Sequence, residues 1–287
     1  LAMADIVRDV AGAAPATSAA ADAGVRYRVI PPDPGRNVHP ALARNRCVED
    51  AYEPGSTFKP FMWAAVMELG LAKYDEVIDT HGGSWRTPEG RVLEAVVPLD
   101  EQTWRDVIVN SSNIGMAQVT ARMSAKQMRD AVLKFGFGKP TGLRVPGESA
   151  GLVTSARDWT NYTQPSVAMG HEVAVTPVQM ALAVSALART GAAAGTLPRL
   201  RLEAVTQEGR RGAYDDEDSS LDTSGGIVPV HRVLPAWVAN LTRDAMKGVG
   251  EAVARRLVRE KVLERLPAHP VFAKSGTSKI AGPNGRG

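Results

Sequence analysis

Ser56 and Lys59 form the pair of residues whose types and spacing first suggest chemistry in this sequence. They stand three positions apart in the string AYEPGSTFKP, residues 51–60, which a largely apolar run follows. On a helix this spacing puts both side chains on one face, and a helix N-terminus favours negative charge that develops at the serine. Such a serine can be activated without a histidine if burial and a neighbouring cation lower the pKa of the lysine. A helix-capping serine followed by a solvated lysine is the alternative that an isolated S-x-x-K leaves open.

Two further strings change the interpretation of this pair. SSN occupies residues 111–113, and KSGT occupies residues 274–277. Alone, the first is typical of a helix N-cap and the second of a turn. In the order S-x-x-K, S-x-N, K-[ST]-G, however, the three strings are the signature of active-site serine enzymes that recognise penicillin. The sequence therefore predicts one serine site assembled from three distant segments.

The chain resembles the transpeptidase domain of class B penicillin-binding proteins, which cross-link bacterial cell-wall peptidoglycan. The resemblance also rests on RNRCVEDAYEPGSTFKP, FGFGKPTGLRVPGESAG and VTPVQMALAVSALARTG, and it runs from about residue 41 to residue 286. It implies an α+β fold (an α/β sandwich) of the penicillin-binding and β-lactamase-like type, with an antiparallel sheet flanked by helices and an all-helical lobe. Residues 1–287 would be a single transpeptidase domain that is incomplete at both ends, without its anchor, pedestal and C-terminal strands and helix.

The resemblance implies that three of the matching residues carry the chemistry. Ser56 would be the nucleophile that attacks the D-Ala-D-Ala bond of a stem peptide, Lys59 the base for this acylation, and Ser111 the relay of a proton towards the leaving group. The acyl group would then pass to an amine on a neighbouring stem. β-Lactams would acylate Ser56 without efficient turnover, and no metal or organic cofactor is implied.

Five further residues would bind the substrate. Asn113 would hold its acyl-chain amide, and Lys274 would support the site electrostatically. Ser275 and Thr277 would meet the substrate carboxylate, while Gly276, which has no Cβ, would let its strand approach closely. The oxyanion hole would consist of the backbone N–H groups of Ser56 and Thr277.

The same family predicts a location and partners. The catalytic domain would be periplasmic, on the extracytoplasmic face of the bacterial inner membrane, with glycosyltransferase and divisome partners bound through regions outside this chain. Glu53 before Pro-Gly and Asn113 at the end of the second motif favour the division-specific, septal branch over the elongation branch. Nucleic acid is not an expected partner, because 34 basic and 31 acidic residues are interspersed and the net charge is +3.

Three alternatives and one departure qualify this interpretation. A serine β-lactamase of class A needs a glutamate in an E-x-x-L-N loop, which RDWTN at residues 157–161 does not provide. A β-lactam sensor could keep all three motifs, whereas the intact motifs argue against a pseudoenzyme. After Gly170 the family has a polar residue and a second glycine, but this chain has His171 and Glu172, which leaves the local backbone open. His171 is expected to be a local hydrogen-bonding residue.

The residue patterns predict mainly helices, with strands towards the two ends of the sequence. Helices are expected at 56–69, on both sides of residues 110–113, and at 124–138, 176–191 and 235–266. Short strands are expected at 196–230 around the acidic string YDDEDSS, and a further strand at 269–282. Residues 11–40 read as a poorly ordered insertion.

The composition indicates a globular chain of one large domain. Of its 287 residues, 44% are hydrophobic, which is enough for a sizeable core. Cys47 is the single cysteine, so an internal disulfide and a cysteine-based zinc site are excluded, and the five histidines lack paired metal-ligand spacing. The sequence has no leader and no run of 18 apolar residues, and both of its ends look like cuts.

Overall fold

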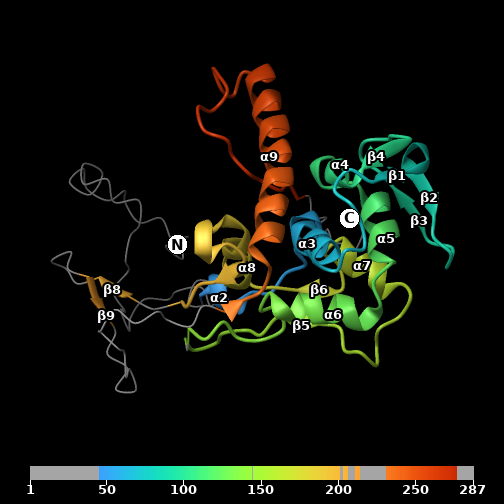
Figure 1. Cartoon of the computed structure of the whole chain (residues 1–287). Coiled ribbons are helices and arrows are strands. Elements are labelled where there is room, and N and C mark those ends of the chain that lie inside the picture. The colour runs from blue at the N-terminus through green and yellow to red at the C-terminus, as the bar shows by residue number, and fades with distance from the viewer. Residues whose placement is uncertain (1–44, 144, 201–202, 206–210, 214–230, 277–287) are drawn as a thin grey trace, which may run out of the picture.

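The computed structural model describes residues 45–143, 145–200, 203–205, 211–213 and 231–276 (Figure 1). The expected insertion at residues 11–40 and the acidic string after residue 213 lie outside this part of the chain. The longer helices are α3 (Lys59–Glu68), α5 (Asn113–Thr120), α6 (Ala125–Lys134), α8 (Pro177–Ala188) and α9 (Ala236–Arg259). Shorter helices are α2 (Arg46–Glu49), α4 (Trp104–Val109) and α7 (Thr163–Ala168), and 3-10 turns occupy Gly55–Phe58, His81–Gly83 and Gly191–Ala193.

The strands form short antiparallel pairs. The pairs are β1 (Val77–Asp79) with β4 (Glu101–Thr103), β2 (Ser84–Arg86) with β3 (Val92–Glu94), β5 (Leu152–Val153) with β6 (Val173–Ala174), β7 (Thr196–Leu197) with β10 (His231–Arg232), and β8 (Glu203–Val205) with β9 (Arg211–Ala213). Helices with antiparallel strands agree with the α+β class. Within the described residues, however, these two- and three-residue strands are too short to assemble into the single sheet that was expected.

Helix α3 runs through the centre of the molecule (Figure 1). Its residues from Lys59 to Met67 are all buried, as the nearly continuous apolar run predicts. Trp63 stacks on Trp104 at a centroid distance of 5.8 Å, and Phe61 packs against Phe135 at 4.9 Å. Each buried aromatic side chain contributes about 2–3 kcal/mol, so these contacts fix the register of α3 against its neighbours and with it the position of Lys59.

The predicted helices around α3 are confirmed at their starts. Thr103, Ser112, Ser124 and Thr176 each accept a hydrogen bond from a backbone N–H of the helix that follows, the last two in full capping boxes. The break between α4 and α5 falls at the predicted string. The caps therefore place the second motif at the junction of two helices.

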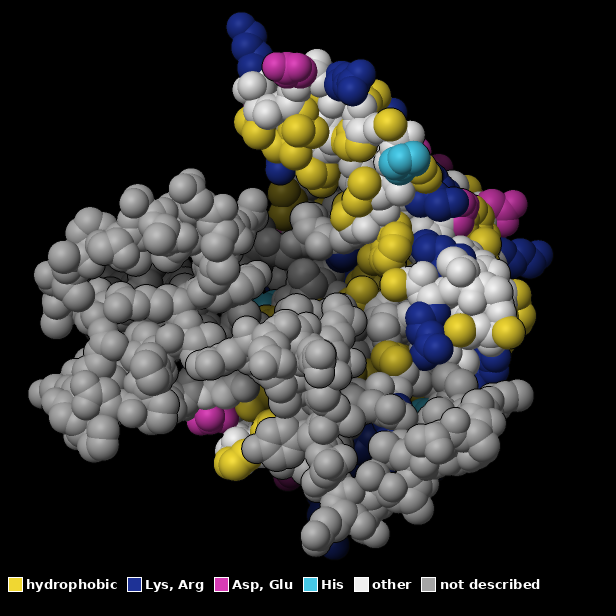
Figure 2. All heavy atoms as spheres, turned by 90° about the vertical axis from the view of Figure 1, so that its left-hand side faces the viewer, with side chains coloured by type: hydrophobic (Ala, Val, Ile, Leu, Met, Phe, Trp, Pro, Cys, Tyr) yellow, Lys and Arg dark blue, Asp and Glu magenta, His cyan; other side chains and the backbone are white. Residues whose placement is uncertain are grey.

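Helix α9 packs its first half across α3, α4 and α8 and then projects from the body (Figure 1). The prediction that it continues to residue 266 is wrong, because Lys261 takes a left-handed φ of +59° and the N–H of Val262 bonds to the carbonyl of Leu257, which ends the helix. Hydrophobic side chains gather on this part of the surface (Figure 2), and Val262 and Leu266, which follow the helix in the sequence, are exposed. In the described part of the chain, no helix is both long and apolar enough to cross a membrane.

The strand predicted at 269–282 is not formed in its described residues, 269–276. A strand needs a paired neighbour for its backbone groups. Here the segment lies against α9 instead, with a hydrogen bond of 3.2 Å from the N–H of Ala273 to the carbonyl of Met246. The close approach depends on Gly250, where a Cβ would stand 1.8 Å from the carbonyl oxygen of Val271.

Candidate active site

Ser56 lies in the 3-10 turn Gly55–Phe58, immediately before α3. Neither this turn nor α3 has a side-chain cap, so the prediction that Ser56 starts and caps the α-helix is wrong. The cause is Pro60, which has no N–H to reach back to the carbonyl of Ser56. That carbonyl accepts from the N–H of Lys59 instead, which tightens the chain into a 3-10 turn.

The Ser56 turn, residues 54–57, presents the serine at the surface of the core. Thr57 closes the turn by donating from Oγ1 to the carbonyl of Pro54 at 2.6 Å. Ser56 is half-buried, and within the described residues its hydroxyl makes no hydrogen bond. The hydroxyl is thus not committed to holding the turn together and is free to face a substrate.

Lys59 joins the first motif to the second. Its side chain is fully buried, and its Nζ lies 2.6 Å from the carbonyl of Ser111, 3.2 Å from Ser111 Oγ and 2.7 Å from Asn113 Oδ1. Burial and, to a lesser extent, the positive charge of Lys274 lower the pKa of Lys59 from 10.5 to about 7. Near neutral pH, Lys59 is therefore divided between ammonium and free amine.

The neutral amine fits these contacts as a proton acceptor. It has two N–H donors and one lone pair, and its two shortest contacts are with oxygen atoms that can only accept, the carbonyl of Ser111 and Asn113 Oδ1. The lone pair is then left for the hydroxyl of Ser111, 3.2 Å away. The arrangement can take up a proton from a serine and hand it on, which is the chemistry that the sequence predicted for Lys59.

Ser111 reaches Lys59 because of an unusual backbone conformation. Its φ is +56°, a left-handed value that is rare outside glycine and that recurs at functional sites. Ser112, not Ser111, caps α5, by accepting from the N–H of Gly115. Asn113 is the first residue of α5 and donates from Nδ2 to the carbonyl of Glu94 at 3.4 Å. The capped helix thus directs Asn113 towards Lys59. The left-handed backbone at Ser111 directs the carbonyl and hydroxyl of Ser111 to the same lysine.

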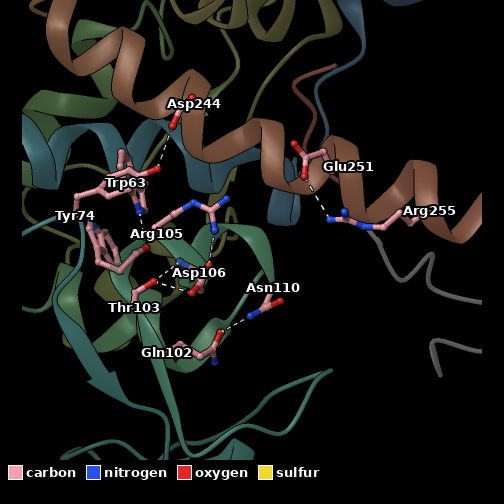
Figure 3. Close-up of polar contacts among 11 residues, drawn as sticks. Trp63, Tyr74, Gln102, Thr103, Arg105, Asp106, Asn110, Asp244, Glu251 and Arg255 are labelled. Atoms are coloured by element: carbon pink, nitrogen blue, oxygen red, sulfur yellow. Dashed lines mark hydrogen bonds and ion pairs between the residues drawn. The ribbon is translucent and has the colours of Figure 1, made fainter. Parts of the chain in front are cut away.

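Polar contacts around α4, which leads into Ser111, join α4 to α3, the end of α4 to Gln102 of β4, and Tyr74 to α9 (Figure 3). Trp63 Nε1 on α3 donates to the carbonyl of Trp104 at 2.9 Å. Asn110, at the end of α4, donates to Gln102 Oε1 at 3.0 Å, and Tyr74 donates to Asp244 on α9 at 3.3 Å. These bonds limit the freedom of α4, so the contacts between Lys59 and Ser111 rest on a rigid support.

The described part of the third motif lies beside the Ser56 turn. A Cβ on Gly276 would stand 2.7 Å from Thr57 Cγ2, so the absence of a side chain permits this contact. Burial lowers the pKa of Lys274 to about 8, and its Nζ donates to the carbonyl of Ser275 at 3.0 Å. Thr277 lies outside the described residues, so its part in carboxylate binding and in the oxyanion hole stays a prediction.

The segment 170–172 borders the same turn. Gly55 donates its N–H to the carbonyl of Gly170 at 3.0 Å. Glu172, where the resemblance predicts a second glycine, adopts a φ of +55°. The backbone at this position is therefore left-handed although the residue carries a side chain. Glu53 Oε1 accepts from the N–H of Glu172 at 2.9 Å, and Glu53 Oε2 lies 3.0 Å from His171 Nδ1, which confirms His171 as a local hydrogen-bonding residue. No periodic pattern in the sequence indicates the link between Glu53 and Glu172.

Replacing Gly170 by alanine tests this packing. The φ of Gly170 is +84°, and a Cβ there would stand 2.1 Å from the carbonyl oxygen of Gly55. The strain and the overlap should together lower the unfolding free energy by about 3 kcal/mol. Gly142→Ala is the matched control, because its φ is +88° and no atom lies within 4 Å of the added Cβ, so it should lose only about 1 kcal/mol. Urea denaturation measures both, and equal losses would contradict the close approach.

Comparisons with known proteins agree on one family. The family model "Penicillin binding protein transpeptidase domain" matches residues 18–287. The chain is 31% identical over 248 residues to "Probable peptidoglycan D,D-transpeptidase PbpC" of Pseudomonas aeruginosa, covering 86% of the chain and 38% of that protein. It is 27% identical over 243 residues to peptidoglycan D,D-transpeptidase FtsI of Escherichia coli K12, covering 85% of the chain and 36% of that protein. The chain thus spans well under half the length of these relatives.

A solved structure agrees with the fold. The crystal structure of penicillin binding protein 3 from Mycobacterium tuberculosis, complexed with aztreonam, matches with a TM-score of 0.58 and 28% identity, over 71% of this chain and 43% of that chain. The α+β class expected from the motifs is thereby confirmed. Among the described residues, no group of three or more histidine, cysteine, aspartate or glutamate side chains is placed to hold a metal ion.

Proposed function

The chain belongs to the penicillin-binding protein transpeptidase family, and from this premise we propose that it is the catalytic part of a serine D,D-transpeptidase. Its substrate would be the D-Ala-D-Ala end of a peptidoglycan stem peptide, and its product a cross-link between two stems. The relatives PbpC and FtsI carry this activity in their names. One observation carries the proposal: the buried Lys59, whose Nζ contacts Ser111 and Asn113, unites two of the three motifs next to Ser56.

The first step would form an acyl-enzyme. Ser56 Oγ attacks the carbonyl carbon of the penultimate D-Ala while its proton passes to the neutral amine of Lys59. Ser111, 3.2 Å from Lys59 Nζ, passes a proton to the nitrogen of the departing D-Ala as the peptide bond breaks. The 3-10 turn supports this role, because it presents the N–H of Ser56 towards negative charge developing on the carbonyl oxygen.

The second step would transfer the acyl group. An amine of a neighbouring stem attacks the ester carbonyl and loses a proton to Lys59, which returns a proton to Ser56 Oγ as the ester C–O bond breaks. Substrate binding is assigned to Asn113 for the acyl-chain amide, to Lys274 for electrostatic support, and to Ser275, Gly276 and Thr277 for the carboxylate end. Lys274, with a pKa of about 8, gives the site near neutral pH the positive charge that a substrate carboxylate requires.

The setting of this activity is proposed from the relatives and from two residues. Glu53 and Asn113 favour the septal branch, and FtsI is among the relatives. The reaction would occur on the extracytoplasmic face of the inner membrane, with the glycosyltransferase and divisome partners outside this chain. We further propose that the chain forms one transpeptidase domain, which its single large core, from Phe58 to Met246, supports.

A fluorescent penicillin tests the proposal in the full-length protein that contains this chain. We expect a covalent adduct that survives denaturing electrophoresis and persists for many minutes, because a transpeptidase deacylates β-lactams poorly. Rapid loss of the label in water would favour a β-lactamase. Labelling without release of D-Ala from a stem-peptide substrate in the presence of an amine acceptor would favour a sensor, and no labelling at all would contradict the proposed function.

A further inference from the structure

Glu53, just before the Ser56 turn, reaches a segment 118 residues further along the chain. Its Oε1 accepts from the N–H of Glu172 at 2.9 Å, and its Oε2 lies 3.0 Å from His171 Nδ1. Burial raises the pKa of the Glu53 carboxyl, but the hydrogen bonds from His171 and Glu172 outweigh it and hold that pKa below its ordinary value. Glu53 is therefore ionised at neutral pH and suited to accept both bonds.

The same distant segment also holds the backbone on both sides of Glu53. Tyr52 and Val175 exchange N–H···O bonds of 3.0 and 2.9 Å, and the N–H of Gly55 bonds to the carbonyl of Gly170 at 3.0 Å. Gly55 directly precedes Ser56. Because the contacts at Tyr52 and Gly55 are made by the backbone and the contact at Glu53 by a side chain, a substitution at Glu53 directly removes the side-chain contact alone.

The partner segment is held in a strained conformation. Glu172 has a φ of +55°, which residues with a side chain rarely adopt. The N–H of Glu172 donates to Glu53 Oε1, and the carbonyl of Glu172 accepts from Thr154 Oγ1 at 2.9 Å. Strain of this kind persists only where surrounding contacts enforce it, and it clusters at functional sites. Without the Glu53 carboxylate, the segment can relax away from this conformation, and Gly170 can shift with it.

We propose that Glu53 is a positioning residue for acylation. By holding His171 and Glu172, its carboxylate keeps Gly170 against Gly55 and thereby orients the hydroxyl of Ser56. The inference rests on the proposed function, because it assigns Glu53 a part in acyl transfer at Ser56. Glu53 acts through Gly170 and Gly55, so its loss should affect the rate of the chemical step more than the binding of the substrate.

The test compares Glu53→Ala and Glu53→Gln in the full-length protein. Stopped-flow acylation by a fluorescent penicillin separates the acylation rate constant from the dissociation constant of the initial complex. Glu53→Ala should lower the rate constant roughly tenfold to a hundredfold, with the dissociation constant and the melting temperature unchanged. Glu53→Gln should restore most of the rate, because its amide oxygen can accept from Glu172 and its amide N–H can donate to His171 Nδ1.

The chain offers a matched control in Asp79→Ala. Asp79 holds a histidine in the same way: its Oδ1 accepts from the N–H of His81 at 2.8 Å, and its Oδ2 lies 3.2 Å from His81 Nδ1. His81 also has a left-handed φ, of +50°, but the pair belongs to the end of β1. Asp79→Ala should acylate at the wild-type rate.

The outcomes separate this inference from the proposed function. Equal acylation by Glu53→Ala and the wild type, equal losses in Glu53→Ala and Asp79→Ala, or a Glu53→Gln variant as slow as Glu53→Ala would each overturn the positioning role. A loss of rate that is matched by a lower melting temperature would also overturn it, because the role of Glu53 would then be structural. A wild type that is not acylated at all would overturn the proposed function itself.

Discussion

Ser56→Ala is expected to abolish covalent labelling by a fluorescent penicillin and to lower cross-linking by about four orders of magnitude or more. The serine hydroxyl supplies the atom to which the acyl group is bonded, so a methyl group at this position leaves no group to acylate. Ser56 is half-buried, and among the described residues its hydroxyl makes no hydrogen bond, so the substitution should not unfold the turn. Gel fluorescence and intact-protein mass spectrometry measure the adduct.

Ser185→Ala is the matched control for this variant. Ser185 lies within α8, where its hydroxyl donates to the carbonyl of Leu182 at 2.6 Å, a bond that a helix does not need. The control should be labelled at the wild-type rate. If Ser56→Ala were still labelled, and the adduct were located on another residue, the assignment of Ser56 as the nucleophile would be wrong.

The helical part of the fold was predictable because its signals are local. The apolar run after Ser56 specifies a buried helix, and the capping boxes at Ser124 and Thr176 mark two helix starts within four residues of sequence. The end of α9 was not predictable in this way, since the charged repeat continues past Lys261 and only the left-handed backbone there stops the helix. The missing strand at residues 269–276 depends on a neighbour that no local pattern specifies.

The motifs in the sequence named candidate site residues but did not indicate their geometry. Lys59 contacts Ser111 and Asn113, whereas the part of Ser56 in catalysis stays a prediction, and burial next to a second cation lowers the Lys59 pKa as expected. The 3-10 turn follows from the missing N–H of Pro60, a signal that the sequence contains. The left-handed backbone of Ser111 leaves no trace in composition or spacing, because tertiary contacts enforce it.

The lowered pKa of Lys59 sets the sign of the pH dependence. The amine is the reactive form, and its fraction rises with pH through about 7, so acylation should increase from pH 6 to pH 8. Lys274, with a pKa of about 8, loses its positive charge above that pH, which should produce a descending limb. The two lysines interact, so the two limbs report apparent pKa values of the pair.

For folding, Lys59 binds fewer protons in the native than in the unfolded chain between about pH 7 and 10.5, so its contribution to the unfolding free energy should increase with pH across that window.

Lys59→Arg is therefore expected to lower the acylation rate constant by about 10²- to 10⁴-fold and to remove the ascending limb near pH 7. Arginine keeps the positive charge and can donate hydrogen bonds to Ser111 and Asn113, but it cannot release its proton in this pH range. Lys134→Arg is the matched control, because arginine can keep both the charge and the hydrogen bond with which Lys134 pairs with Glu68, so the pH profile should be unaltered. Stopped-flow acylation between pH 5.5 and 9 measures both variants. If Lys59→Arg kept the ascending limb, the group that titrates near pH 7 would be another residue, and Ser56 would be activated by a base other than Lys59.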